Sequence, residues 1–174
     1  MMISEEVQLG RAKNALLSYL ENRLFIPKVF LNTEWDGHPL DVLAIDRDGS
    51  GDVHAILLFL RSYDEVGELR KVYQGEQIEK LVDRLLSVPA HWRYVAAVES
   101  DRHVRAPFGV SESTAERCFS EDGIGRIGFL TVDAPLDREP SVKVEVRPER
   151  FRAKVAKIAV EYVAQHTADW EIRA

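Results

Sequence analysis

The sequence predicts an α/β protein in which a mixed β-sheet of about six strands is flanked by helices. Three observations support this fold class. Strand-like segments lie between a helical start and a helical end; the first three strands are separated only by short turn sequences; and a helical segment then joins the third strand to a fourth. Strands joined by turns pair antiparallel, whereas a helical crossover joins parallel strands. The expected order is α-β-β-β-α-β-(α)-β-β-α, in which the bracketed helix is a short one over 112–120.

The helices are predicted from apolar residues that recur at helical spacing. Ser4 is the expected N-cap of the first helix, and Glu5 and Glu6 follow in its first turn, where the helix dipole favours acidic side chains. Pro27 and Pro89 come soon after the first two helices, as expected for residues that cannot continue a helix. The three long helices are expected over residues 4–24, 65–87 and 149–165.

The strands are predicted from β-branched and alternating apolar residues between turn signals such as "DGHP" and "RDGSGD". In 53–61 apolar residues occupy both parities, which indicates a central strand buried on both faces. In 141–148 the valines alternate strictly with charged residues, so we expect all three valines on one face of a half-exposed strand. The six strands are expected over residues 28–35, 40–46, 53–61, 93–100, 126–133 and 141–148.

Length and composition limit the classes of function. A chain of 174 residues suits one domain, here 1–174, with a sizeable core. The net charge of −6 means that any contact with nucleic acid needs a local basic patch. The single cysteine, Cys118, excludes an internal disulfide and agrees with a reducing compartment. No segment has the length of a membrane span and the N-terminus lacks the pattern of a signal peptide, so we expect a cytoplasmic protein without a membrane partner.

One stretch carries a resemblance to a known family. In "WDGHPLDVLAIDRDGSGDVHAILLFLRSYDEV" an acid, Asp41, opens the second strand of a three-strand meander that a helix and a further strand follow. This order resembles the restriction-endonuclease-like fold, also called the PD-(D/E)XK nuclease superfamily. The resemblance covers 4–100 best, and "GIGRIGFLTVD" and "SVKVEV" resemble two additional strands of small bacterial members. It implies a three-layer core in which the sheet lies between helices.

The resemblance also implies a metal-dependent site. In the family an Asp and a Glu on neighbouring strands bind Mg²⁺, and a Lys two residues after the Glu helps to activate the attacking water. Asp41 matches the first acid and is the predicted metal ligand. The places of Glu and Lys fall on Leu57 and Phe59, or, in the preferred alignment, on Phe59 and Arg61. Neither alignment supplies a carboxylate, and arginine is a poor proton donor because its pKa exceeds about 12.

Acids elsewhere in the chain are candidates for the missing second carboxylate. Glu99 at the end of the fourth strand is one candidate, and Glu5 or Glu6 of the first helix is another, since many family members carry a glutamate there. His38 precedes Asp41 close to the expected cleft and is a further candidate catalytic residue. Asp41 also has a structural interpretation, because an acid at the start of a strand often caps backbone N–H groups.

Two groups of basic residues are the candidates for nucleic-acid contacts. One follows the fourth strand and includes Arg102 and Arg105; the other surrounds the last helix and includes Arg150 and Lys154. Phosphate binding needs such clusters. For the second group, a solvated helix face balanced by neighbouring glutamates is the favoured alternative.

These observations leave three functions open. The first and favoured one is a catalytically degenerate nuclease-like protein, without a cofactor, that acts as a nucleic-acid-associated binding module. The second is an active nuclease that uses Mg²⁺ and a migrated carboxylate. The third is a scaffold domain that binds a protein partner or forms a homodimer, which the net charge of −6 mildly favours over the first.

Overall fold

The computed structural model describes residues 5–46, 51–61, 71–99, 118, 125–135 and 137–166, with the side chains of 71–76 excepted. Arg102 and Arg105 lie outside the described residues. So does the short helix expected over 112–120, apart from Cys118.

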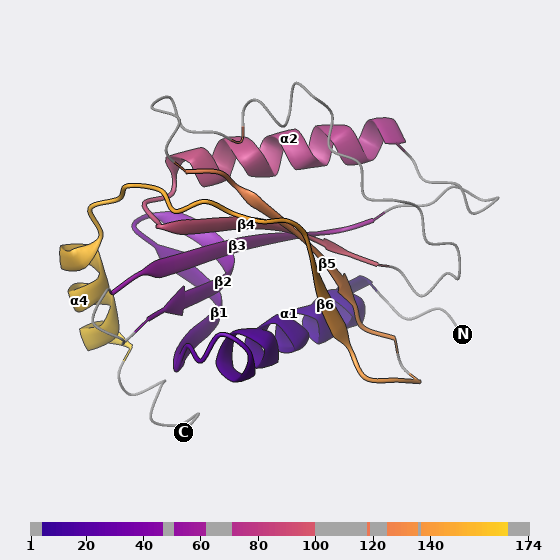
Figure 1. Ribbon diagram of the computed structural model, residues 1–174, viewed down its shortest axis with the longest axis horizontal. Helices are drawn as coiled ribbons and strands as arrows, with labels where there is room; N and C mark the ends of the chain where they lie inside the picture. Colours follow the sequence, from indigo (N-terminus) through magenta and orange to yellow (C-terminus); the bar gives the residue numbers. More distant parts are fainter. Residues whose placement is uncertain are drawn as a thin grey trace.

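The described residues form an α/β fold with a six-stranded mixed sheet and three helices, in the order α-β-β-β-α-β-β-β-α (Figure 1). This order agrees with the one expected from the sequence. No helix in the described parts of the chain is both long and apolar enough to span a membrane. The elements are α1 Glu5–Asn22, β1 Lys28–Trp35, β2 His38–Ile45, β3 Val53–Leu60, α2 Lys71–Ser87, β4 Trp92–Val98, β5 Gly128–Asp133, β6 Ser141–Val146 and α4 Ala156–Gln165.

The strands lie side by side in chain order, from β1 at one edge to β6 at the other. β1, β2 and β3 form the expected antiparallel meander. β3, β4 and β5 are parallel, and β6 returns antiparallel to β5. The turn between β1 and β2 has positive φ angles of 49° at Asp36 and 79° at Gly37. Asp-Gly is a preferred sequence for the turn type with two positive φ angles, whose twist matches that of the strands it joins.

Apolar side chains cover both faces of the sheet. Ile56 and Leu58 of β3 belong to the core that α1 covers, whereas Leu57 and Phe59 belong to the core beneath α2 and α4. Figure 1 shows α1 and α2 on opposite faces of the sheet. The expectation that β3 is buried on both faces is therefore confirmed, and each large apolar side chain so buried contributes about 1.5–3 kcal/mol.

The alternation expected for the last strand is wrong. The pairing of β5 with β6 shifts by one residue, because Phe129 pairs with Val146 and Leu130 with Val144. The extra residue, Glu145, puts Val142 in the core beneath α1 and Val146 in the core beneath α2 and α4. A bulge of this kind on an edge strand also hinders pairing with another chain.

The last helix begins later than expected, at Ala156 instead of residue 149. Residues 147–155, which we call the C-terminal strap, cross the sheet from β6 to α4 without forming a helix (Figure 1). The reason is that the backbone of the strap bonds to other elements: Glu149 pairs with Arg126, and the Phe151 N–H donates to the His91 carbonyl over 2.7 Å. Beyond the strap, α4 is held by Tyr162, whose ring packs edge-on against Phe30 and Trp35.

Replacing Gly125 by alanine tests how closely the strap packs. A Cβ atom at Gly125 would lie 2.6 Å from Cγ of Phe151, and its φ of +103° disfavours any other residue. We expect Gly125→Ala to lower the free energy of unfolding by about 1–3 kcal/mol. Gly10→Ala is the matched control: a Cβ there meets nothing within 4 Å, so we expect a gain of about 0.5–1 kcal/mol. Urea denaturation measures both, and an equal effect of the two substitutions would contradict the packing described.

Candidate functional site

Asp41 caps the sheet at the point where β2 separates from β3. The backbone pairing of β2 with β3 ends at Val42 and Ile56. Asp41, which precedes Val42 in β2, continues the contact with its side chain, because its Oδ2 accepts the Leu58 N–H over 2.7 Å. Opposite Asp41, Asn32 of β1 has a φ of 50° and drops out of the β1–β2 pairing. The carboxylate thus replaces a backbone acceptor that the irregular strand pair does not supply.

Lys13 of α1 neutralises this carboxylate. Its Nζ lies 3.5 Å from Oδ1 of Asp41 and also donates a hydrogen bond to Oδ1 of Asn32. The lysine side chain is 17% exposed and that of Asp41 31%, so the pair is partly shielded from water. Nothing in the spacing of the sequence joins Lys13 to Asp41, because they are 28 positions apart and β1 lies between them.

The side of the sheet on which Asp41 lies differs from the one that the family alignment suggested. Because Leu40 and Leu43 both point into the core beneath α2, the alternation of β2 is broken between them, and the Asp41 carboxylate meets α1 instead. On that side β3 presents Leu58 and Leu60. Phe59, which both alignments placed in the site, and Leu57, which one of them did, point into the opposite core.

Arg61 and Glu99 come together at the carboxyl ends of β3 and β4. These strands run parallel in a register that pairs Leu60 with Val98, so the next two residues are neighbours. Their side chains form an ion pair and are only 1% and 7% exposed. The backbone extends the sheet here, since the Arg61 N–H donates to the Val98 carbonyl and the Glu99 N–H to that of Val132. Strand alternation puts the pair on the α2 side, away from the Asp41 carboxylate.

The remaining candidates of the nuclease site lie apart. Glu6 is exposed in the first turn of α1, and seven residues separate it from Lys13, a rise of about 10 Å along the helix. His38 is half-buried at the start of β2, where it pairs with Trp35. Among the described residues, no group of three or more His, Cys, Asp or Glu is placed to hold a metal ion. A catalytic role for Glu6 or His38 stays a prediction.

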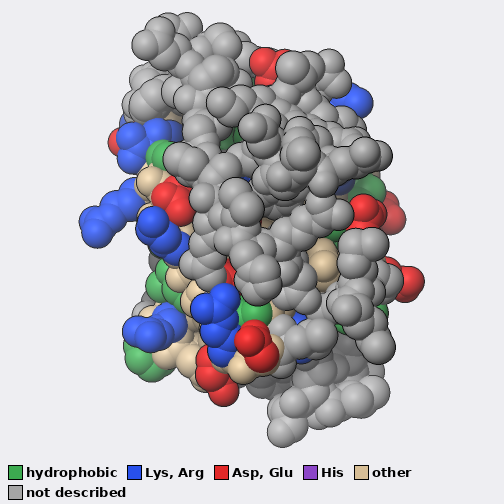
Figure 2. Space-filling model, turned by 90° about the vertical axis from the view of Figure 1, so that its right-hand side faces the viewer, with side chains coloured by type: hydrophobic (Ala, Val, Ile, Leu, Met, Phe, Trp, Pro, Cys, Tyr) green, Lys and Arg blue, Asp and Glu red, His purple; other side chains and the backbone are tan. Residues whose placement is uncertain are grey.

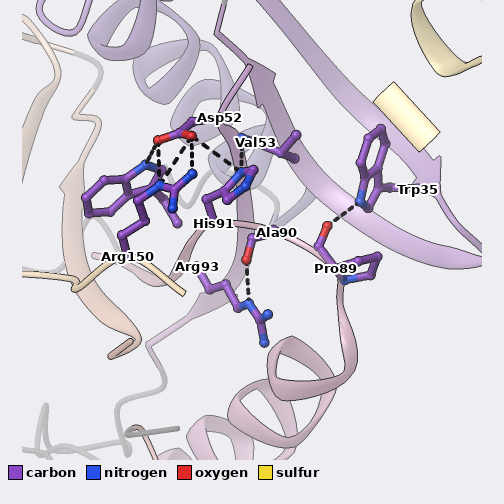
Figure 3. Close-up of polar contacts among 9 residues, drawn as sticks. Trp35, Asp52, Val53, Pro89, Ala90, His91, Arg93 and Arg150 are labelled. Carbon is purple, nitrogen blue, oxygen red and sulfur yellow. Dashed lines mark hydrogen bonds and ion pairs between the residues drawn. The ribbon is translucent and has the colours of Figure 1, made fainter. Parts of the chain in front are cut away.

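A polar cluster that the sequence did not indicate lies at the opposite end of β3. Asp52 accepts two hydrogen bonds from Arg150, from Nη2 over 2.8 Å and from Nε over 3.1 Å, and a third from Nε1 of Trp92 over 2.9 Å (Figure 3). These donors, Arg150 first among them, lower the pKa of Asp52 to about 2 although burial opposes them. In the sequence Asp52 follows a glycine-rich turn and Arg150 belongs to a basic run. Nothing in either pattern predicts that the two side chains meet.

Two histidines beside this cluster are held neutral. Nδ1 of His91 accepts the Val53 N–H over 3.0 Å, and burial lowers the pKa of His91 (Figure 3). His54 lies against the rings of Trp92 and Tyr94, and burial lowers its pKa to about 4. A buried neutral histidine cannot supply positive charge near pH 7, so neither ring attracts an anion there.

Arg93 is buried and serves the end of α2. Its Nε donates to the carbonyl of Ala90 and its Nη1 to those of Leu85 and Leu86, at 2.9–3.1 Å. Its guanidinium also lies 4.0 Å from the centre of the Phe151 ring. A cation at the C-terminus of a helix is favourable because it meets the negative end of the helix dipole. Arg93 therefore joins the end of α2 to the strap.

Comparison with known proteins supports the fold alone. None of the protein-family models and none of the curated proteins matches this sequence. One similar solved structure is SPO1766, a protein of unknown function from Silicibacter pomeroyi, with a TM-score of 0.51 and 13% sequence identity. The similarity covers 97% of this chain and 90% of that one.

Substitution of Asp41 separates its capping role from metal binding. Asp41→Ala leaves the Leu58 N–H without its acceptor, and we expect a loss of about 1–3 kcal/mol in the free energy of unfolding. Asp41→Asn keeps an acceptor oxygen and gives up only the attraction of Lys13, so a loss below about 1 kcal/mol is expected. Chemical denaturation of both variants makes the comparison. The capping role is refuted if Asp41→Asn is as destabilising as Asp41→Ala.

Acid should destabilise the protein through His54. Its pKa falls from 6.5 in the unfolded chain to about 4 in the fold, so the unfolded state binds more protons between these values. The contribution of neutral His54 to the free energy of unfolding is fully present above pH 6.5. About 3 kcal/mol of it is lost as the pH drops to 4. His91 acts in the same direction. In His54→Gln the pH dependence of the unfolding free energy should be shallower over this range by up to about 1.4 kcal/mol per pH unit; an unchanged slope would exclude His54 as the cause.

Proposed function

We propose that this protein is a catalytically inactive restriction-endonuclease-like protein that binds nucleic acid. The order of helix, antiparallel three-strand meander, crossover helix and parallel strand supports the fold-level part of the proposal. The placement of α1 and α2 on opposite faces agrees with the three-layer core that the resemblance implies.

The contacts of Asp41 support the proposal that the protein has no nuclease activity. One carboxylate oxygen accepts the Leu58 N–H and the other faces the ammonium group of Lys13. An Mg²⁺ ion bound to Asp41 would have to compete with both the Leu58 N–H and the Lys13 ammonium group for these two oxygens. The neighbouring positions of β3 on the same side, Leu58 and Leu60, have no oxygen in their side chains.

Glu99 does not restore the site. Its carboxylate is neutralised by Arg61 and lies on the opposite side of the sheet from that of Asp41. Releasing it would break a buried ion pair, a change that costs about 3–5 kcal/mol. We infer that the pair is retained for the structure of the strand ends.

The binding part of the proposal depends on local basic surface. Figure 2 shows a face on which Lys and Arg side chains gather on the left, with Asp and Glu among them. Lys154 is exposed, and Arg102 and Arg105 remain proposed contacts outside the described residues.

A role in binding a protein, or a second copy of this chain, is the other candidate. Phe25 favours it, because its side chain is 81% exposed and its φ is 56°. A bulky residue in that backbone region is strained, and an exposed aromatic ring gains nothing from folding.

Nuclease and binding assays test the proposal together. With Mg²⁺ or Mn²⁺ present, we expect no cleavage of duplex or single-stranded DNA or RNA by the wild type. We expect binding of nucleic acid at low salt that weakens steeply as salt rises. Metal-dependent cleavage that disappears in Asp41→Ala would establish the active nuclease instead. Absence of any binding at low salt would favour the protein-binding candidate.

A further inference from the structure

The C-terminal strap and the first turn of α4 form the most basic stretch of the described chain. Residues 147–157 contain five basic residues and one acid, a net charge of +4 in a chain of −6. Within the strap, Phe151 and Val155 are buried whereas Arg152 and Lys154 between them are exposed. This alternation of inward and outward side chains is typical of an extended chain.

The strap is held in place by contacts along its inner side. Arg150 bonds to Asp52, the Phe151 N–H donates to the His91 carbonyl, and the Phe151 ring lies under the Arg93 guanidinium. Arg150 is thus engaged by Asp52. Arg152 and Lys154 project from a backbone that is already fixed in place. A ligand that binds them therefore loses little free energy to ordering of the segment.

The outward cations of the strap lack the carboxylate partners that two surface cations near β6 have. On β6 and the turn before it, Lys143 lies 3.5 Å from a carboxylate oxygen of Glu145 and Arg138 lies 3.8 Å from one of Asp133. Among the described residues, no carboxylate comes within 4.0 Å of the exposed cations of the strap and α4. These cations are Arg147, Arg152, Lys154 and Lys157.

We propose that the strap is a binding surface for the phosphate backbone of duplex nucleic acid, with Arg152 and Lys154 as its central contacts. Two residues of extended chain span about 6.6 Å, a distance comparable with that between successive phosphates of one strand. The strap exposes no aromatic ring on which an unpaired base could stack, since Phe151 is buried. Binding is therefore to the backbone, without base recognition, and favours a paired strand over unstacked bases. The inference rests on the proposed function and assigns its surface.

The test compares two double variants of the full-length chain by fluorescence anisotropy. Arg152→Gln with Lys154→Gln removes the proposed contacts. Arg138→Gln with Lys143→Gln removes the same charge from cations that have carboxylate partners. Each protein is titrated into a short labelled DNA duplex, and separately into its single strand, at several salt concentrations between about 50 and 200 mM. Thermal unfolding of each variant checks that it is folded.

The strap variant is expected to bind the duplex at least about tenfold more weakly, and its plot of log affinity against log salt should be shallower by about 2. The control variant should bind more tightly than the strap variant and keep the steeper salt dependence. If the wild type binds but the two variants lose affinity equally, or the strap variant loses none, the strap is not the surface and the proposed function survives. Preference for the single strand overturns the assignment of a duplex. A wild type that binds neither probe overturns the proposed function and the inference with it.

Discussion

Burial of β3 from both faces is the constraint on which the rest of the structure depends. A strand whose side chains are all packed has no water to solvate the charged groups at its ends, so these groups must find partners within the fold. Arg61 at one end pairs with Glu99, and Asp52 just before the other end pairs with Arg150. Beside the strand, Asp41 accepts the Leu58 N–H that β2 leaves without an acceptor.

The same pairing decides what the acids near β3 can do. A carboxylate that already accepts hydrogen bonds and faces a cation is stabilised as an anion but has little left to offer a metal ion. Asp41 meets Lys13, Glu99 meets Arg61, and Asp52 meets Arg150. Three acids around the central strand are thus each paired with a basic side chain from a distant part of the chain. This arrangement supports the inactivity part of the proposal, whereas the binding part depends on the basic surface.

The fold was predictable from the sequence to a large extent, and the site much less so. Each strand begins or ends at a turn or proline that the sequence displays, and β3 shows its double burial as an apolar run in both parities. The start of the last helix was missed because the strap is as apolar on one side as a helix is, and only bonds to His91 and Arg126 reveal that it is extended. The broken alternation around Asp41 was missed because the residues of β2 give no sign of it. The one sign lies in β1, where Asn32 is a residue type that tolerates positive φ well.

What the sequence determined by itself was local: the periods of its helices and strands, the Asp-Gly turn of the first hairpin, and the presence of one acid within β2. The tertiary structure decided which charges meet. Lys13 and Asp41, Arg61 and Glu99, and Asp52 and Arg150 are 28, 38 and 98 residues apart. A pattern of spacing extends over a few turns or one strand, whereas an ion pair depends on where the sheet register and the crossovers carry its two members.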